Sequence, residues 1–212
     1  MDTENWLMLL AQLPSKPSSA RVALWRHMRG AGATAVVNGS WMLPATESHK
    51  TLFEQSRDDI VKRGGTAFVL LVSGPSPESN REIVRLFQAD RSREYSEFAE
   101  RCTAFLNEIN RESAAEKYTF AEMEESEQDL KKLARWLAKI QARDFFPDGR
   151  RGQSAALLAQ CRRALRAFSR EVYKVEEANE AAAEWEFPVI LAPEGDILPP
   201  GAGFLAAEAE ER

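Results

Sequence analysis

The order of the predicted elements in residues 6–73 is the feature that most constrains the fold of this chain. A short apolar run closed by two prolines predicts a strand, and a helix ended by two glycines follows it. Two β-rich pieces then flank Asn38-Gly39, a dipeptide that favours a two-residue type I′ hairpin. A second helix from Thr46 to Arg63 and a final strand complete the order strand, helix, hairpin, helix, strand, which is that of the ferredoxin-like βαββαβ unit.

The first and last predicted strands are apolar at successive positions. The runs WLMLLAQL at residues 6–13 and TAFVLLVS at residues 66–73 do not alternate between apolar and polar side chains. An antiparallel sheet with helices on one face normally shows that alternation. We therefore expect the second face of the sheet to be covered, either by the rest of this chain or by a second copy.

The rest of the chain is predicted to be helical. Ser76 before Pro77, and Thr119 three residues before Glu122, are typical of helix N-termini. Apolar residues then recur at alternating spacings of three and four along three segments: Tyr95, Phe98, Cys102, Phe105 and Ile109; Leu130, Leu133, Leu137 and Ile140; and Leu158, Cys161, Leu165, Phe168, Val172 and Val175. Three such helices should pack as an antiparallel bundle, with both cysteines as buried thiols.

These elements predict an α+β fold in three parts. Residues 5–74 form the ferredoxin-like unit, residues 76–183 form a helical bundle packed on it, and residues 184–212 form an acidic tail rich in proline, glycine and alanine. No apolar run approaches the length of a membrane span, and neither a basic leader nor a disulfide framework is indicated. We therefore expect a cytoplasmic protein that makes no membrane contact.

The charge of the chain is segregated. The net charge is −5, but residues 176–212 hold ten acidic residues against one arginine, so the preceding residues are net positive. No Asp or Glu occurs between Glu4 and Glu47, and the cations of that span gather around the first predicted helix: Lys16, Arg21, Arg26 and Arg29.

These four cations are the candidate nucleic-acid contacts, because cationic side chains bind phosphates and release counterions. At about 100° per residue, Val22, Leu24, Trp25 and Met28 are predicted to form the buried side of the helix, with Arg21 and Arg29 close to that side and Arg26 and His27 outside it. The alternative is an ordinary solvated helix face, with carboxylate partners from the helical half of the chain.

Other patterns of catalytic or metal sites are weak. The stretch GAGATA at residues 30–35 follows a helix and precedes a strand, the reverse of a dinucleotide-binding loop. His27 and His49 have no Cys or carboxylate neighbours at ligand spacing, and the acid-free span offers no carboxylate for the magnesium ion of a ferredoxin-like nuclease. We therefore expect no metal, no cofactor and no enzymatic activity.

The stretch LLAQLPSKPSSARVALWRHMRGAGATAVVNGSWMLP resembles the N-terminal domain of the ChrB chromate-resistance proteins. The shared pattern is a strand ending in Gln-Leu-Pro, then KPSS, an arginine-rich helix with a Trp-Arg pair, Gly-Ala and a hairpin that closes on Leu-Pro. The similarity continues through ESHKTLFEQSRDDIVKRGG and RDFFP, and covers about residues 5–178. The middle part of PaaX-type repressors looks similar.

The resemblance implies a chromate-responsive, DNA-binding transcriptional regulator of the cytoplasm that controls a chromate efflux transporter. Family members of the usual length continue into a second domain thought to sense chromate, so we expect a repressor truncated to the N-terminal half. The leading hypothesis is a homodimer that binds duplex DNA at the promoter of a chromate-resistance operon through Lys16, Arg21, Arg26 and Arg29. Two alternatives stay open: a non-catalytic accessory protein, whose basic helix docks an acidic partner or the chain's own tail, and a ferredoxin-like nuclease.

Overall fold

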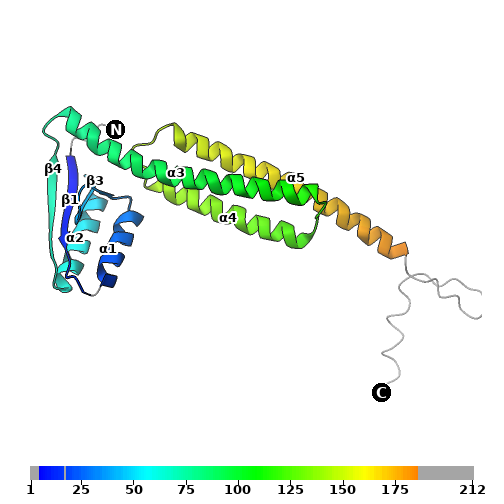
Figure 1. Cartoon of the computed structure of the whole chain (residues 1–212), viewed down its shortest axis with the longest axis horizontal. Coiled ribbons are helices and arrows are strands. Elements are labelled where there is room, and N and C mark those ends of the chain that lie inside the picture. Colours follow the sequence, from blue (N-terminus) through cyan, green and yellow to red (C-terminus); the bar gives the residue numbers. More distant parts are fainter. Residues whose placement is uncertain (1–4, 17, 186–212) are drawn as a thin grey trace, which may run out of the picture.

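The computed structural model describes residues 5–16 and 18–185 of the chain. In chain order its elements are β1 (Asn5–Gln12), α1 (Ser18–Gly30), β2 (Thr34–Ala35), β3 (Ser40–Pro44), α2 (Glu47–Lys62), β4 (Thr66–Ser73), α3 (Pro77–Ala114), α4 (Phe120–Ala142) and α5 (Gly149–Trp185). The first six elements form a compact unit, and α3, α4 and α5 form a bundle that extends away from it (Figure 1). The predicted α+β class is confirmed. The tail was expected to begin at residue 184, but α5 extends to Trp185, and residues 186–212 lie outside the described residues.

The sheet has the strand order β2-β3-β1-β4, with antiparallel pairing between all neighbours. This is the order that a ferredoxin-like βαββαβ unit produces, because each helix connects strands that are not adjacent. Helices α1 and α2 lie on one face of the sheet (Figure 1). Strand β4 is an edge strand, paired on one side only with β1.

Three helices begin where the local sequence signals place them. The side chains of Thr46, Ser76 and Thr119 each accept a hydrogen bond from the backbone N–H three residues further on, at the starts of α2, α3 and α4. Each cap satisfies one of the free N–H groups that a helix N-terminus leaves. These helix starts were therefore predictable from a few consecutive residues.

The β2–β3 turn differs from the predicted type I′ geometry. The Ser40 N–H donates to the Val37 carbonyl, so Asn38 and Gly39 are the central residues as expected, but only Gly39 has a positive φ, of 79°. A type I′ turn needs positive φ at both positions. Gly39 also approaches Ala11 so closely that an added Cβ would lie 2.7 Å from the Ala11 carbonyl oxygen. The glycine is thus required by packing against β1 as well as by its φ.

The two faces of the sheet are covered unequally. Leu9 and Ala67 are buried together with Phe53 and Ile60 of α2, on the face that the helices cover. Phe68 and Leu70 alternate with Ala67 along β4 and so lie on the opposite face, where they are 58% and 41% exposed. The expected cover of the second face is therefore present only in part.

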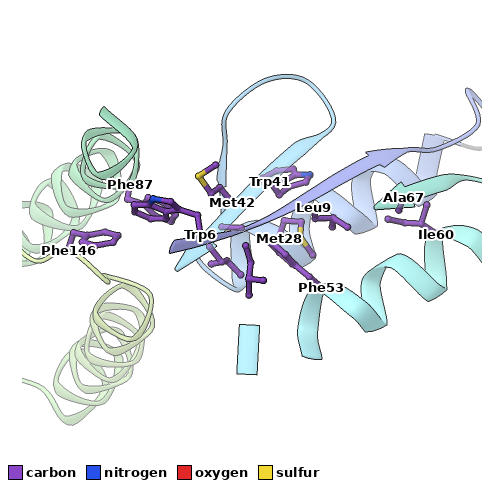
Figure 2. Close-up of a cluster of buried hydrophobic side chains, with 13 residues drawn as sticks. Trp6, Leu9, Met28, Trp41, Met42, Phe53, Ile60, Ala67, Phe87 and Phe146 are labelled. Carbon is purple, nitrogen blue, oxygen red and sulfur yellow. The ribbon is translucent and has the colours of Figure 1, made fainter. Parts of the chain in front are cut away.

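An aromatic cluster covers one end of that second face and joins the unit to the bundle. Trp6 of β1 stacks on Phe87 of α3, with ring centroids 5.6 Å apart, and both rings contact Phe146 from the connection between α4 and α5. The Trp6 indole N–H also donates to Asn80 at 3.0 Å. Figure 2 shows Trp6, Phe87 and Phe146 together at one end of the core and Phe53, Ile60 and Ala67 toward the other.

The bundle core is drawn from the predicted apolar seams. Phe98, Cys102, Cys161 and Val172 are fully buried in it, and the cysteines are free thiols, as predicted. The Cys161 thiol lies 3.7 Å from the Cys102 carbonyl oxygen, and contact with Cys161 together with burial raises the pKa of the Cys102 thiol. Val175 is 37% exposed, so the third seam ends one position earlier than expected.

Over residues 5–16 and 18–185, none of the helices combines the length and apolar character needed to cross a membrane.

Candidate nucleic-acid interface

Three of the four predicted contact residues are exposed on or beside α1. Arg21 and Arg26 lie on the helix, Lys16 lies just before it, and none of the three forms an ion pair with a described residue. Helix α1 contains no acidic residue that could neutralise them. Their positive charges therefore face solvent and are free to meet an anionic partner.

Trp25 and Val22, which were predicted to be buried, lie on this same exposed face. Trp25 is 54% exposed and Val22 is 45% exposed. The helix buries only the side that carries Met28, with Leu24 partly buried one turn earlier. Trp25 is rotated by about 100° from Leu24, so a narrow buried side leaves it outside. We name Arg21, Val22, Trp25 and Arg26 the α1 basic face.

Arg29, the fourth predicted residue, is engaged within the chain. Its guanidinium lies 2.6 Å from the Asp90 carboxylate of α3 and 3.9 Å from that of Glu94. The Asp90 carboxylate also accepts a hydrogen bond from the Thr34 hydroxyl at 2.9 Å, and it forms an ion pair with Arg93. Burial alone would raise the pKa of Asp90, but the Thr34 hydrogen bond and the charges of Arg29 and Arg93 outweigh it and lower the pKa below its usual range.

A second carboxylate, that of Glu94, forms ion pairs with three arginines. Arg91 lies 3.1 Å away, Arg143 lies 3.0 Å away, and Arg29 approaches from α1. Arg91 is buried, and its Nε and Nη2 atoms have no hydrogen-bond partner among the described residues. Burial lowers the pKa of Arg91, and the neighbouring charges of Arg143 and Arg29 lower it further, against the opposing charge of Glu94.

These contacts fix the direction in which α1 presents its basic face. Arg29 of α1 and Arg143, which follows α4, are both bound to the same turn of α3. Gly32 then passes so close to Arg143 that an added Cβ would lie 2.6 Å from the Arg143 Cβ, which gives the GAGATA stretch a packing role. Helix α1 is thereby held against the bundle as well as against its own sheet.

Sequence reasoning missed most of this network, although its residues carry a signal. The segment RDFFP supplies Arg143 to Glu94, Asp144 to the Tyr95 hydroxyl at 2.8 Å, and two phenylalanines to the aromatic cluster. A charged pair followed by two aromatic residues in a short break between helices suggests packing rather than an exposed loop. The partners of Arg143 and Asp144 lie 49 positions away along the chain, and Trp6, which contacts Phe146, lies farther still, so these contacts could not be read from local patterns.

The two histidines take part in no metal-like cluster. His49 contacts the Pro44 carbonyl oxygen at 2.8 Å through Nδ1 and packs edge-on against Phe145. His27 is exposed on α1. In the described parts of the chain, no three His, Cys, Asp or Glu side chains gather where they could hold a metal ion.

Comparison with known proteins agrees with the resemblance seen in the sequence. The family model described as "Protein ChrB, N-terminal" matches residues 21–179, which span most of α1, the strands β2, β3 and β4, helices α2, α3 and α4, and most of α5, but not β1. The chain belongs to this family. Protein ChrB of Cupriavidus metallidurans is 28% identical over 143 residues, which cover 68% of this chain and 41% of that protein. The chain therefore matches less than half the length of this ChrB relative.

A solved structure of an uncharacterised protein is also similar in part. Rv0674 from Mycobacterium tuberculosis matches 82% of this chain and 64% of its own chain, with 17% sequence identity and a TM-score of 0.38.

Proposed function

We propose that this ChrB-family protein is a DNA-binding transcriptional repressor of chromate resistance that contacts duplex DNA through α1. The observation that carries the proposal is the α1 basic face, where Arg21 and Arg26 are exposed and no acidic residue of the helix opposes them. Lys16 extends this positive surface at the N-terminal side of the helix. Such a surface suits a DNA backbone, because each neutralised phosphate releases counterions.

Arg29 has a different part in this proposal. Because its guanidinium is bound to Asp90 and Glu94, it orients α1 and leaves the phosphate contacts to Lys16, Arg21 and Arg26. The protein acts in the cytoplasm as a binding protein, without catalysis and without a cofactor. Chromate acts as the signal that lowers its affinity for the promoter.

The proposed regulator is a homodimer that forms through β4, the edge strand of the sheet. Strand β4 is an edge strand of eight residues with no charged side chain, and it exposes Phe68, Leu70 and Leu71. An apolar, unpaired edge favours pairing with another strand. Two copies would present two α1 basic faces, and the second contact then forms at a high effective concentration.

The decisive experiment measures binding to the promoter region upstream of the protein's own operon. Exchange of Arg21 and Arg26 for Ala should weaken binding by about tenfold and reduce the salt slope by about two, one for each lost phosphate contact. The matched control exchanges Arg57 and Lys62 of α2 for Ala. This variant also loses two cations, but each of them is paired with a carboxylate, Arg57 with Asp58 and Lys62 with Asp59. Chromate should reduce wild-type binding, and an unchanged affinity would remove chromate as the signal.

A second candidate function is that of an accessory interaction protein. The exposed Trp25 and Val22 between two arginines favour it, because aromatic and arginine side chains are enriched in protein interfaces. In that case the wild type and the Arg21/Arg26 variant would bind the promoter equally weakly at low salt. A Trp25→Ala exchange would then abolish capture of an acidic protein partner.

A further inference from the structure

Helix α5 carries a second run of positive charge. From Gly149 to Arg170 the sequence contains no Asp or Glu and six arginines: Arg150, Arg151, Arg162, Arg163, Arg166 and Arg170. The last four are exposed, and none of them forms an ion pair with a described residue. We name these four residues the α5 arginine stripe.

The stripe differs from the paired lysines of the bundle surface. Arg135 and Lys139 of α4 are also exposed and form no ion pair with a described residue, but the stripe, unlike them, lies in a segment without Asp or Glu, residues 149–170. Lys131, Lys132 and Lys174 each pair with a carboxylate three or four positions away on the same helix. In the stripe, the residue four positions after Arg162 and the residue four positions after Arg166 are themselves arginines, so that Arg162, Arg166 and Arg170 follow one another on successive turns. Like charges at this spacing destabilise a helix. The arrangement therefore does not serve the stability of α5, which points to a partner outside the chain.

The stripe faces away from α3 for most of its length. Ala164 lines the groove between α3 and α5 together with Ile109 and Asn110, and Arg170, the last residue of the stripe, lines the same groove. Arg162 and Arg166 are each two positions from Ala164, which turns them about 200° around the helix axis, to the opposite side. They are thus free of the acidic residues that α3 carries.

The stripe is also held at a set distance from α1. Cys161 contacts Cys102 of α3, and Asp90, which binds Arg29, precedes Cys102 on the same helix. At about 1.5 Å per residue, Arg162 lies about 18 Å along α3 from the Arg29 contact and Arg170 about 30 Å. Both distances fall within one turn of a DNA duplex, about 34 Å.

We propose that the α5 arginine stripe is a second DNA-binding surface, which contacts backbone phosphates of the same duplex that α1 binds. This inference rests on the proposed function and extends it to the bundle. A guanidinium binds phosphate through two parallel hydrogen bonds, and arginines repeated on each turn suit a linear array of phosphates. Because phosphates carry no base identity, the stripe contributes affinity and orientation rather than sequence preference.

A membrane surface is the less suitable partner. A helix that lies in a membrane interface buries an apolar face among the lipids. The apolar face of α5, with Leu158, Leu165 and Phe168, is already buried in the bundle core. Anionic vesicles therefore serve as an outcome of the test rather than as the proposed partner.

The test compares three double variants of the full chain. Arg162→Gln with Arg166→Gln removes two stripe cations, Lys131→Gln with Lys132→Gln removes two paired cations from the adjacent α4, and the Arg21/Arg26 variant removes the α1 contacts. Each is titrated against the promoter duplex and an unrelated duplex of equal length over a range of salt. The stripe variant should bind both duplexes about tenfold more weakly, with a salt slope lower by about two, and the α4 variant should match the wild type.

The outcomes separate this inference from the proposed function. If the α1 variant lost DNA binding and the stripe variant did not, the stripe would not be a DNA-binding surface, while the proposed α1 interface would stand. If only the stripe variant lost DNA binding, the stripe would be supported and the proposed α1 interface would be wrong. A wild type that binds neither duplex, or a stripe variant that loses binding only to phosphatidylserine vesicles, would overturn the inference. Thermal unfolding excludes misfolding, because the stripe variant loses like-charge repulsion and should unfold at no lower temperature.

Discussion

The ferredoxin-like unit and the helical bundle complete their hydrophobic cores in different ways. The bundle core is formed by α3, α4 and α5, with Tyr118 added from the connection between α3 and α4. The core of the sheet unit includes Phe87 from α3 and Phe146 from the connection that follows α4. The sheet unit is therefore completed by residues of the helical half, whereas the bundle takes nothing from the sheet.

The reason for this difference lies in the shapes of the two units. Three helices with continuous apolar seams can turn all of those seams toward one another. A four-stranded sheet has two faces, and α1 and α2 cover only one of them. The second face needs an external cover, which α3 and Phe146 provide at the Trp6 end only. The bundle thus orients the unit that carries the α1 basic face.

The largest effect should follow removal of the side chain that joins the two cores. Trp6→Ala deletes a fully buried ring, its stacking on Phe87 and its hydrogen bond to Asn80. We expect a loss of about 3 to 5 kcal/mol in the stability of the sheet unit, because a cavity remains. Hydrogen exchange should show faster exchange in β1 and β4, with the α5 core amides unchanged.

A matched control is Val37→Ala in the same unit, at a side chain that is 66% exposed and lies outside β4. Its effect should stay within about 0.5 kcal/mol. If hydrogen exchange in the Trp6 variant became faster in α5 as much as in β1, the two cores would unfold as one unit. That result would contradict a bundle core that is complete without the sheet.

A smaller effect should follow disruption of the polar contact between the two units. Asp90→Asn keeps a hydrogen-bond acceptor for Thr34 but removes the charge that Arg29 and Arg93 bind. We expect a loss of about 2 kcal/mol, since hydrogen bonds to charged groups are the stronger ones. Asp58→Asn is the control, because Asp58 pairs with Arg57 on the exposed surface of α2.

The pH dependence of this effect has a defined sign. The folded structure lowers the pKa of Asp90, so its contribution is fully present above the unfolded-state pKa of about 3.9. That contribution is lost as the pH falls below this value and through the lower folded-state pKa. The difference in unfolding free energy between wild type and Asp90→Asn should therefore shrink on acidification. Urea unfolding of both proteins from neutral pH to about pH 3 measures it, and a constant difference would contradict the assigned pKa direction.

The smallest effect on the stability of the monomer should come from the open sheet edge. Exchange of both Phe68 and Leu70 for Lys alters two exposed side chains, and the monomer should change by less than about 1 kcal/mol. Sedimentation should instead show a shift from dimer to monomer, because lysines on an edge strand oppose pairing. Val61→Lys on α2, also at an exposed position, should leave the dimer intact. A wild type that sediments as a monomer would exclude dimerisation through this edge.

Much of the secondary structure was predictable from short stretches of sequence. Thr46, Ser76 and Thr119 cap helices where their patterns indicate, and the apolar spacings place Phe98, Cys102 and Cys161 in the bundle core. The turn at Asn38-Gly39 was predicted in place but not in type, because the approach of Gly39 to Ala11 of another strand sets its geometry. Of the candidate site, Lys16, Arg21 and Arg26 are exposed as expected, while the exposure of Trp25 was not foreseen.

The order of the elements, the apolar seams and the two acid-free runs of cations follow from residues that are close together along the chain. Which of these cations remain free depends instead on the packing of distant elements. Arg29 and Arg26 are both cations of the same helix, yet Arg29 meets Asp90, 61 positions away, while Arg26 meets solvent. The physical reason is that an ion pair between distant residues exists only where packing brings their elements together, and here the Trp6, Phe87 and Phe146 contacts bring α3 beside α1.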